Sequence, residues 1–555
     1  MLYHSLQDCV EQVSQHYDVV CKISCDFPDF NTAQQQLYYA IAAAYLSEYK
    51  NNQRLIFTIT EDFYHSSQPY GIILNLLQSI LNDLDIPNYF VCLISTNNKI
   101  AEEYKAVHQN WNQDPNPINL IYCTGDFRKK IADRPYLTGK MQSFKKILPV
   151  IQKLDQTQKH RLFGNDSFCI MPWLGVHVGP DSQVRPCCDS KLIMGKASDQ
   201  SLEEIWNSPS TVQLRTQLLN NQQPQSCQTC YVKESLGADS LRKSINREFA
   251  HSIEIVNNGT IAQNSIKYWD IRYNNLCNFA CRSCDSVSSS AWNQVYNNIN
   301  TDQSRKTVYL EAGNDQDQIY QQILQHLDQV EKIYFAGGEP SMIENFYRIL
   351  DLLDQRQRHK VKLVYNINLS KLKLKHWNLA EIWQKFPNVS VGASLDAEGQ
   401  RAEYLRSGTV WTDIVTNRKL LQEKCAHIDF YVSATTGLIN ALHLPDFHQS
   451  WTEQGLIEAE QFAVQILFTP EWMSIKNAPQ ILKQKIINRY QQHLEWLKPR
   501  DSLGRATSGF SSIIEICKEP DNYDPKKFWD NVKKLDRYHN TTLFDYYPEL
   551  VDCGL

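Results

Sequence analysis

Three cysteines lie within eight residues near the middle of the chain, in the stretch LCNFACRSCD. Their spacing, Cys277-x3-Cys281-x2-Cys284, allows three thiolates to converge on one metal centre without help from distant chain. Four thiolates would close a tetrahedral zinc site or a complete iron–sulfur cluster. Three thiolates on a [4Fe–4S] cluster leave one iron open to another ligand. Structural zinc with a remote fourth ligand is the alternative interpretation of this loop.

The distribution of cysteines favours metal binding over disulfides. The chain has 16 cysteines, and eight of them fall in two segments, Cys169–Cys230 and Cys277–Cys284. The others stand singly, several in apolar runs, as buried small hydrophobic residues do. A disulfide framework would spread them over a secreted chain. The N-terminal stretch MLYHSLQDCVEQ lacks a basic region followed by an apolar one, so we expect no signal peptide and a cytoplasmic location.

Length and composition describe an ordinary globular chain of several domains. Its 555 residues are too many for one core and predict two to four domains. The net charge of -5 argues against a protein with a broad nucleic-acid-binding surface. No run of 18 apolar residues is present, so we expect no membrane partner.

The stretch 265–475 has a regular alternation of strand and helix patterns. Helical segments such as IENFYRILDLLDQ and DIVTNRKLLQEKC separate the strands. Right-handed crossovers between consecutive strands predict a parallel sheet, curled as a partial (βα)6 TIM-like barrel. The three-cysteine loop follows the first strand, at the carboxyl edge where ligands bind in such folds. The six predicted strands are IKYWDIRY, KIYFAG, KLVYNINLS, VSVGASLD, DFYVSATTG and FAVQILFTP.

Three further regions surround this predicted barrel. Residues 1–150 alternate strands (YDVVCKISC, RLIFTIT, YFVCLIST, INLIYCTG) with helices (AQQQLYYAIAAAYLSEY, YGIILNLLQSILNDL), which predicts an α/β domain with a largely parallel sheet. Residues 160–250 read as a small cysteine-rich module, in which Asp199 or Ser201 would cap a helix at DQSLEEIW. A bound metal would supply the stability that its few apolar residues do not. Residues 476–555 predict a helical and irregular tail.

The cysteine motif and its position in the predicted barrel resemble those of the radical S-adenosylmethionine superfamily. Its Cx3Cx2C motif follows the first strand, and FAGGEP follows the second, with Gly337, Gly338, Glu339 and Pro340. In that family the GGE(P) segment binds the amino group of S-adenosylmethionine. Two glycines let the backbone approach a ligand, and a carbonyl or the Glu339 carboxylate accepts hydrogen bonds from an ammonium group.

The resemblance extends to the ends of later strands. Segments VYNINLS, GASLDA and EYLRSG stand where the family contacts the cofactor, and Arg406 resembles the arginine that binds its carboxylate. One departure is that Ser283 precedes the third cysteine, where the family usually has an aromatic residue against adenine, while the loop's aromatic residue is Phe279. The cofactor-binding candidates in these segments are Asn366, Asn368, Ser370, Ser394, Asp396 and Arg406.

The upstream cysteines resemble the auxiliary-cluster modules called SPASM and twitch. That resemblance implies a four-thiolate set for a second [4Fe–4S] cluster, with Cys188 as a spare; CxxC is also a common zinc half-site. Only one such set is present, so twitch is the closer match, although here the module precedes the barrel and Ser182 replaces a family glycine. The implied ligands are Cys169, Cys187, Cys227 and Cys230.

Together these resemblances imply an enzyme that cleaves S-adenosylmethionine reductively and abstracts hydrogen from a substrate. The substrate would be a peptide or protein side chain, or a sugar or other small metabolite. An electron donor such as flavodoxin or ferredoxin would reduce the three-cysteine cluster. Two alternatives remain open: a binding or structural protein stapled by zinc, and an iron–sulfur electron carrier that does not turn over S-adenosylmethionine.

Overall fold

The computed structural model describes five strands within residues 1–149, and then residues 150, 153–235, 240–256, 266–299, 309–314, 316–501, 504–520 and 522–555. The chain divides into two compact units. One comprises Met1–Asn165 with Arg247–Ile253, and the other comprises Asp166–Asn246 with Glu254–Leu555. Each unit is described by itself.

The first unit contains a five-stranded parallel sheet. All four strands predicted for this region are present, and a short additional strand, β1, pairs with β5. The sheet order is β1-β5-β4-β3-β2. The two helices predicted here fall outside the described residues. The strands are β1 (Leu2–Tyr3), β2 (Val19–Ile23), β3 (Leu55–Thr60), β4 (Tyr89–Ile94) and β5 (Asn119–Cys123).

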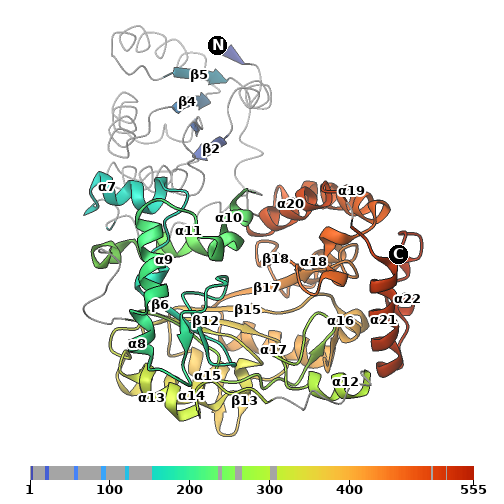
Figure 1. The fold of residues 1–555 in the computed structure, drawn as a ribbon. Helices are drawn as coiled ribbons and strands as arrows, with labels where there is room; N and C mark the ends of the chain where they lie inside the picture. Colours follow the sequence, from blue (N-terminus) through green and yellow to red (C-terminus); the bar gives the residue numbers. More distant parts are fainter. Residues whose placement is uncertain are drawn as a thin grey trace. The chain divides into compact units, whose positions relative to one another are not determined.

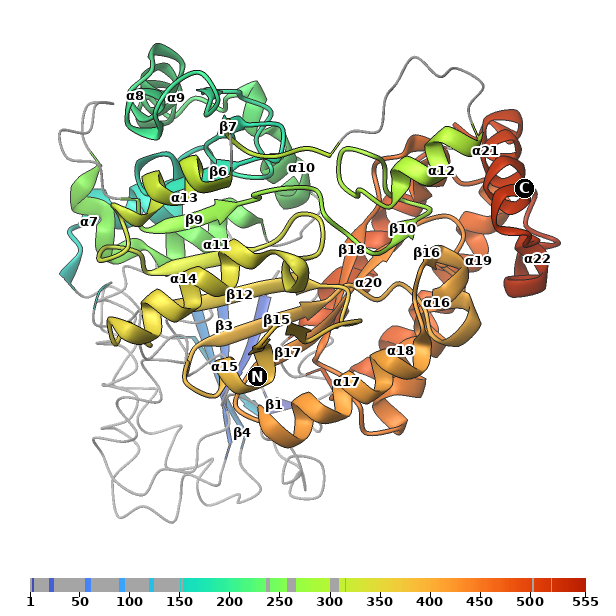
Figure 2. The same ribbon diagram turned by 90° about the horizontal axis from the view of Figure 1, so that it is seen from below.

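The second unit is built on a nine-stranded sheet, of which six strands are those predicted for residues 265–475. These six are parallel and neighbour one another in chain order. Burial alternates along the longer strands, so one face packs on helices while the other is less buried (Figures 1 and 2). They are β9 (Tyr268–Ile271), β11 (Lys332–Phe335), β12 (Lys362–Ile367), β15 (Val389–Ala393), β17 (Asp429–Thr436) and β18 (Phe462–Ile466).

Amphipathic helices follow these strands. In α14 the apolar residues at three- and four-residue spacing are buried, and the ring of Phe346 lies 4.9 Å from that of Phe335 on β11. The short helix α15 (Leu379–Trp383) begins after Asn378, whose side chain accepts a hydrogen bond from the Ala380 N–H. The helices are α12 (Trp292–Ile299), α13 (Gln316–Leu324), α14 (Glu344–Gln355), α15 (Leu379–Trp383), α17 (Trp411–Lys424) and α18 (Leu444–Glu453).

The cysteine-rich segment shares this sheet instead of forming a separate one. Its strand β6 (Gly175–Val178) pairs in parallel with β9, and two short antiparallel strands, β7 (Gln183–Arg185) and β8 (Gly195–Lys196), continue the sheet outward. Ser201, and not Asp199, caps α8 (Leu202–Trp206) in a capping box with Glu204. The helices that follow are α9 (Pro209–Leu219), α10 (Gln228–Ser235) and α11 (Leu241–Glu248).

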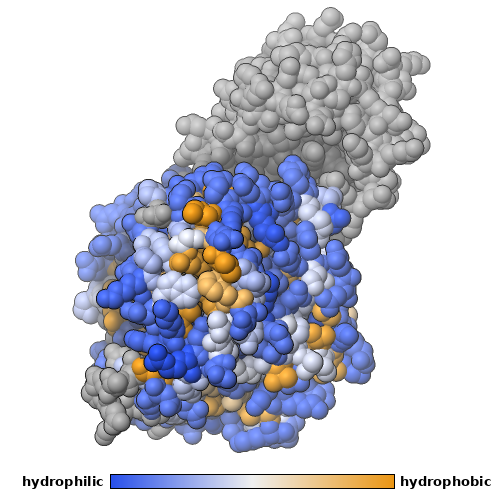
Figure 3. Space-filling model, turned by 90° about the vertical axis from the view of Figure 1, so that its right-hand side faces the viewer, coloured by the Kyte–Doolittle hydropathy of each residue, from blue (hydrophilic) through white to orange (hydrophobic). Residues whose placement is uncertain are grey.

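The C-terminal segment is helical, as predicted. Helix α20 reaches the sheet, where its Gly509 lies against Val464 of β18, whereas α21 packs on α12 through an apolar cluster of Leu535, Trp292 and Val295. Among the described residues, no helix is long and apolar enough to span a membrane. On the face in Figure 3, hydrophilic residues surround a smaller number of apolar ones. The helices are α19 (Gln480–Leu497), α20 (Arg505–Cys517), α21 (Pro525–His539) and α22 (Leu543–Tyr546).

Candidate cofactor site and metal centres

The three-cysteine loop is held in a defined conformation after β9. The Cys277 N–H donates to the Ser290 hydroxyl at 3.2 Å, and the Cys284 N–H donates to the Cys281 carbonyl at 2.9 Å. The same carbonyl accepts from the Trp292 indole at 2.7 Å. Residues 280–281 form β10 (Ala280–Cys281), which pairs antiparallel with β16 (Arg406–Ser407), so that Cys281 lies opposite Arg406.

The three thiols of this loop form no disulfide and are wholly or partly buried. Burial raises the pKa of each, that of Cys281 to about 11. A buried thiol loses its proton readily only beside a compensating positive charge, which a metal cluster supplies. Across the described residues, no three His, Cys, Asp or Glu side chains are arranged to hold a single metal ion.

A buried arginine inside the motif ties the loop to the C-terminal helices. Arg282 is 2% exposed, and its Nε donates to the Tyr404 carbonyl at 2.8 Å. A terminal nitrogen lies 2.7 Å from Asp536 of α21 and 2.9 Å from the Thr541 hydroxyl. The guanidinium also stacks 3.7 Å above the ring of Tyr404. No local feature of the sequence predicts this contact, because an arginine between two cysteines is not a pattern that indicates burial.

The GGEP segment after β11 lies directly against the cysteine loop. The Glu339 N–H donates to the Leu276 carbonyl at 2.7 Å. Gly337 and Gly338 have φ of +83° and +44°, and a Cβ on Gly338 would lie 2.3 Å from that same carbonyl oxygen. Only glycine fits this position, both for conformation and for space. The two motifs that the sequence analysis singled out are therefore adjacent.

The carboxylate of Glu339 is engaged within the fold. It is 1% exposed, and burial raises its pKa. One oxygen accepts from the N–H and hydroxyl of Ser341 at 3.1 and 2.7 Å, and the other accepts from the Asn368 N–H at 2.7 Å. Pro340 begins the short helix η6 (Pro340–Met342). Glu339 thereby fixes the turn that presents the backbone of Gly337 and Gly338.

Asn368 and Ser370 extend this network back to the cysteine loop. The Asn368 amide donates to the Asn278 side-chain carbonyl at 2.9 Å, and Asn278 donates to the Ser370 hydroxyl at 3.0 Å. Asn366 is turned elsewhere: its amide donates to the Tyr334 hydroxyl at 2.6 Å. The structure thus joins two of these three candidates to the loop and leaves Asn366 outside that network.

Arg406 and Asp396 form a buried pair beside Cys281. An Arg406 terminal nitrogen donates to Asp396 at 2.7 Å, and the other Asp396 oxygen accepts from the Thr435 N–H at 2.8 Å. Burial opposes the charge on Arg406, but Cys281 and Asp396 hold its pKa above the usual range. Its Nε is buried and has no hydrogen-bond partner among the described residues. Ser394 is tied to this region through its N–H, which donates to the Ile367 carbonyl at 2.8 Å.

Phe279 is in no position to contact a ligand in this structure. Its side chain is 1% exposed, and its Cδ1 lies against Gly408, where an added Cβ would approach to 3.0 Å. The aromatic residue of the loop is therefore part of the packing behind it. Adenine contact from the loop's own aromatic side chain has no support here.

The upstream cysteines line one cavity of about 20 Å³. Met171, Tyr231 and Leu241 contribute apolar walls, which shield the thiols from water. Burial raises the pKa of all four thiols. Cys188 is not among the residues that line this cavity. The cysteines in its wall are Cys169, Cys187, Cys227 and Cys230.

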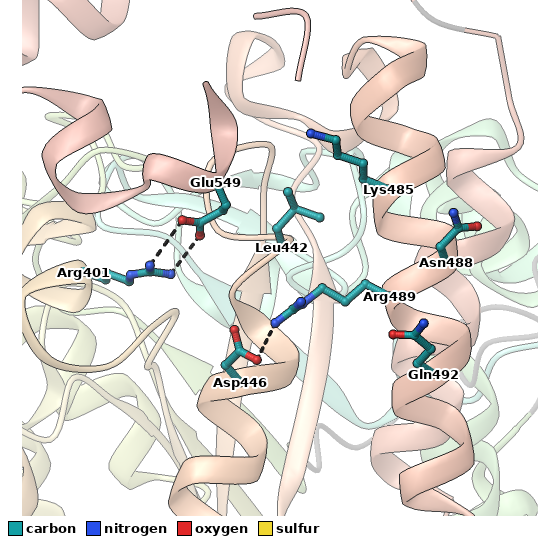
Figure 4. Close-up of a pocket in the computed structure, with 8 residues that line it drawn as sticks. All are labelled: Arg401, Leu442, Asp446, Lys485, Asn488, Arg489, Gln492 and Glu549. Atoms are coloured by element: carbon teal, nitrogen blue, oxygen red, sulfur yellow. Dashed lines mark hydrogen bonds and ion pairs between the residues drawn. The ribbon is translucent and has the colours of Figure 1, made fainter. Parts of the chain in front are cut away.

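A larger hollow of about 520 Å³ lies among the C-terminal helices (Figure 4). Its charged groups pair with one another: Arg401 contacts Glu549 at 2.8 Å, and Arg489 contacts Asp446. Lys485 donates to the Asp552 carbonyl at 2.9 Å. No cysteine lines this hollow, and its charged side chains contact one another, although the Arg489 Nε has no hydrogen-bond partner among the described residues.

Comparison with known proteins identifies the cysteine-rich segment. Residues 169–231 match the SPASM family, an iron-sulfur cluster-binding domain. The match begins at Cys169 and ends one residue after Cys230, so it spans the predicted ligand set. The prediction of a SPASM- or twitch-type segment is confirmed, and the family that matches is SPASM, not twitch. No curated protein matches the chain.

Two solved structures show a weaker likeness. "Native anSMEcpe with bound AdoMet" is 15% identical, with 40% of this chain and 58% of that chain covered and a TM-score of 0.30. "Native anSMEcpe with bound AdoMet and Cp18Cys peptide" is 14% identical, with 40% and 58% covered and a TM-score of 0.30. The chain therefore spans less than two thirds of either protein, and the likeness carries no inference about activity.

Proposed function

We propose that this protein is a radical S-adenosylmethionine enzyme with one auxiliary iron–sulfur cluster. The observation that carries the proposal is the contact between its two motifs. The Leu276 carbonyl, next to Cys277, accepts from the Glu339 N–H and leaves room only for glycine at position 338. A three-thiolate loop and a glycine-rich ligand segment thereby meet at the carboxyl edge of six parallel strands, which fits a partial barrel at residues 265–475.

In this proposal each group at the site has a defined task. Cys277, Cys281 and Cys284 hold a [4Fe–4S] cluster with one open iron. When bound, the cluster and S-adenosylmethionine supply radical chemistry: reductive cleavage of the sulfonium and abstraction of hydrogen from the substrate. The backbone of Gly337 and Gly338, with Glu339 behind it, receives the cofactor's ammonium group.

The remaining candidates orient the cofactor. The buried, unpartnered Nε of Arg406 is available to an anion, which supports its assignment to the cofactor carboxylate. Asp396 holds that guanidinium in place. Asn368 and Ser370 contact Asn278 of the loop, and with Asn366 they are candidates to lie near the cofactor's ribose, while Ser394 would face the cofactor beside Asp396.

The auxiliary module completes the proposed enzyme. Its four cavity cysteines (Cys169, Cys187, Cys227, Cys230) would saturate a second [4Fe–4S] cluster, suited to electron transfer or to structure. Residues 1–150 would form a separate α/β domain, and residues 476–555 a helical tail. The substrate would be a peptide or a small metabolite, with flavodoxin or ferredoxin as the electron donor.

Anaerobic reconstitution tests this proposal against its alternatives. A radical enzyme should bind about eight irons per chain, show a reduced EPR signal that S-adenosylmethionine perturbs, and form 5′-deoxyadenosine with dithionite. Two zinc ions and no colour would indicate a zinc-stapled binding protein. Iron without 5′-deoxyadenosine would indicate an electron carrier.

Cysteine variants assign the two sites. Cys281→Ala should abolish 5′-deoxyadenosine formation, and Cys230→Ala should lower the iron content by about half. Cys425→Ala is the matched control, because this buried thiol donates to the Ala380 carbonyl on the outer helices and lies in neither cluster of cysteines. Undiminished cleavage by Cys281→Ala would refute the assignment of the site.

A further inference from the structure

Three charged or titratable side chains form a linked group where the module meets the first barrel strand. Asp270 on β9 lies opposite His177 on β6 in the register of the sheet. The His177 Nδ1 lies 2.9 Å from one Asp270 oxygen, and the Arg272 Nε lies 3.3 Å from the other. Burial opposes ionisation of Asp270, but Arg272 and His177 lower its pKa to about 2. Asp270 is therefore ionised and fixed from two sides.

Arg272 has unused donors at the exposed end of this group, whereas the His177 Nδ1 and the Asp270 oxygen beside it, which have no hydrogen-bond partner in the described part of the chain, are buried. Only its Nε has a hydrogen-bond partner among the described residues; its two terminal nitrogens have none. The side chain is 28% exposed, while that of Asp270 is 1% exposed. Arg282 and Arg406, which also lie beside the cysteine loop, are both less exposed, and each places one terminal nitrogen on a carboxylate, that of Asp536 or Asp396.

Arg272 lies between the GGEP segment and the first strand of the cysteine-rich segment. A Cβ on Gly337 would lie 2.8 Å from the Cβ, Cγ and Cδ of Arg272, so the aliphatic stem runs along the GGEP segment. The Arg272 N–H donates to the carbonyl of Val178 on β6 at 2.9 Å, which holds its backbone against the cysteine-rich segment. A ligand on Arg272 would therefore touch the cofactor segment and face the auxiliary module.

We propose that Arg272 binds a carboxylate of the substrate, with Asp270 and His177 as positioning residues; this inference rests on the proposed function. Two adjacent N–H groups of a guanidinium match the two oxygens of a carboxylate. A phosphate dianion fits less well, because the fixed negative charge of Asp270 offsets the single positive charge of Arg272. The carboxylate can belong to a small organic acid or to a peptide, and the experiment distinguishes these sources.

Chemical modification of arginine tests the site without relying on turnover. Reconstituted protein is treated with phenylglyoxal under anaerobic conditions, and modification of each arginine peptide is followed by mass spectrometry. The protecting probes are succinate, N-acetyl-triglycine, N-acetyl-triglycine amide, inorganic phosphate and S-adenosylmethionine. Arg356, half-exposed and paired with Asp328, is the internal control.

We expect a carboxylate probe at about ten times its Kd to slow modification of Arg272 about tenfold, with Arg356 unaffected. Protection by succinate indicates a small acid, and protection by N-acetyl-triglycine but not its amide indicates a peptide terminus. Arg272→Gln should weaken binding of the protecting probe about tenfold or more in calorimetry, and Arg272→Lys, which keeps the charge without the fork, should weaken it less. Arg356→Gln should change nothing.

Three results would overturn the proposal: equal protection by the amide, stronger protection by phosphate, or no protection by any carboxylate. Full protection of Arg272 by S-adenosylmethionine alone would assign it to the cofactor and refute the substrate role. The proposed function is judged separately, from 5′-deoxyadenosine formation by the wild-type protein. A negative result for Arg272 protection can therefore be distinguished from a negative result for 5′-deoxyadenosine formation.

Discussion

Replacing Arg282 with methionine should loosen the three-cysteine loop while leaving its cysteines in place. Arg282 joins the loop to α21 through Asp536, and its Nε satisfies the Tyr404 carbonyl. Methionine fills similar volume but donates no hydrogen bond. The loop between Cys281 and Cys284 then loses its polar attachment to the C-terminal helices.

The loss of stability in Arg282→Met depends on the hydrogen bonds that the Asp536 carboxylate keeps. Breaking a buried ion pair typically costs about 3–5 kcal/mol, because the remaining charge is left unpaired. Asp536 keeps three donors: the Tyr404 hydroxyl at 2.9 Å, the Thr541 hydroxyl at 3.0 Å and the Leu543 N–H at 3.0 Å. We therefore expect the lower end of the range, about 3 kcal/mol.

Urea unfolding of the apoprotein measures this loss, and iron content after anaerobic reconstitution measures its effect on the site. Arg401→Met is the matched control. Arg401 lies on α16 (Gly399–Leu405) and pairs with Glu549, and both side chains are about one-quarter exposed. That variant should lose about 1 kcal/mol or less and keep its iron. Equal losses in the two variants, with iron unchanged in Arg282→Met, would refute the clamp.

Three further predictions concern other parts of the second unit. Gly338→Ala should destabilise the fold by about 1–3 kcal/mol and weaken binding of S-adenosylmethionine, measured by calorimetry, because the methyl group would collide with the cysteine loop. Burial lowers the pKa of His448 to about 4 and that of its partner His493, 3.0 Å away, to about 3. The unfolded chain binds these protons near pH 6.5, so the free energy of unfolding should fall as pH drops from 6.5 toward 4, and His448→Gln should flatten that slope in urea titrations. Finally, Cys188→Ser should keep the full iron content while Cys187→Ser loses about half; the reverse result would exchange the ligand and the spare.

Local patterns in the sequence were sufficient to predict the strands of the second unit and to find the two motifs of the site. The six parallel strands of residues 265–475 form where the apolar runs predicted them, and the C-terminal segment is helical. The contact between LCNFACRSCD and FAGGEP followed from topology, because loops after neighbouring parallel strands lie at the same edge. Gly338 shows why the motif needs glycine there: φ is +44° and a carbonyl oxygen occupies the space of a Cβ.

The sequence alone could not predict which strands pair over a long separation along the chain. GVHV at β6 reads as a short apolar run in a turn-rich module, and nothing local indicates that it pairs with β9, about 90 residues later. The burial of Arg282 could not be predicted either, because it is a charged residue between two cysteines and its partner Asp536 lies far along the chain. The Ser201 cap, by contrast, was a local choice between two candidates.

The strand order has a consequence for how the protein avoids unwanted association. A sheet border presents unpaired N–H and C=O groups that can recruit strands from other molecules. Here β6 to β8 cover the border that β9 would otherwise expose, and the new border is a strand of only two residues, Gly195–Lys196, with an exposed lysine. Short length and a lysine are both features that discourage such recruitment. A chain trimmed to begin at residue 266 would uncover the apolar border of β9, and we expect it to aggregate even with every barrel residue intact.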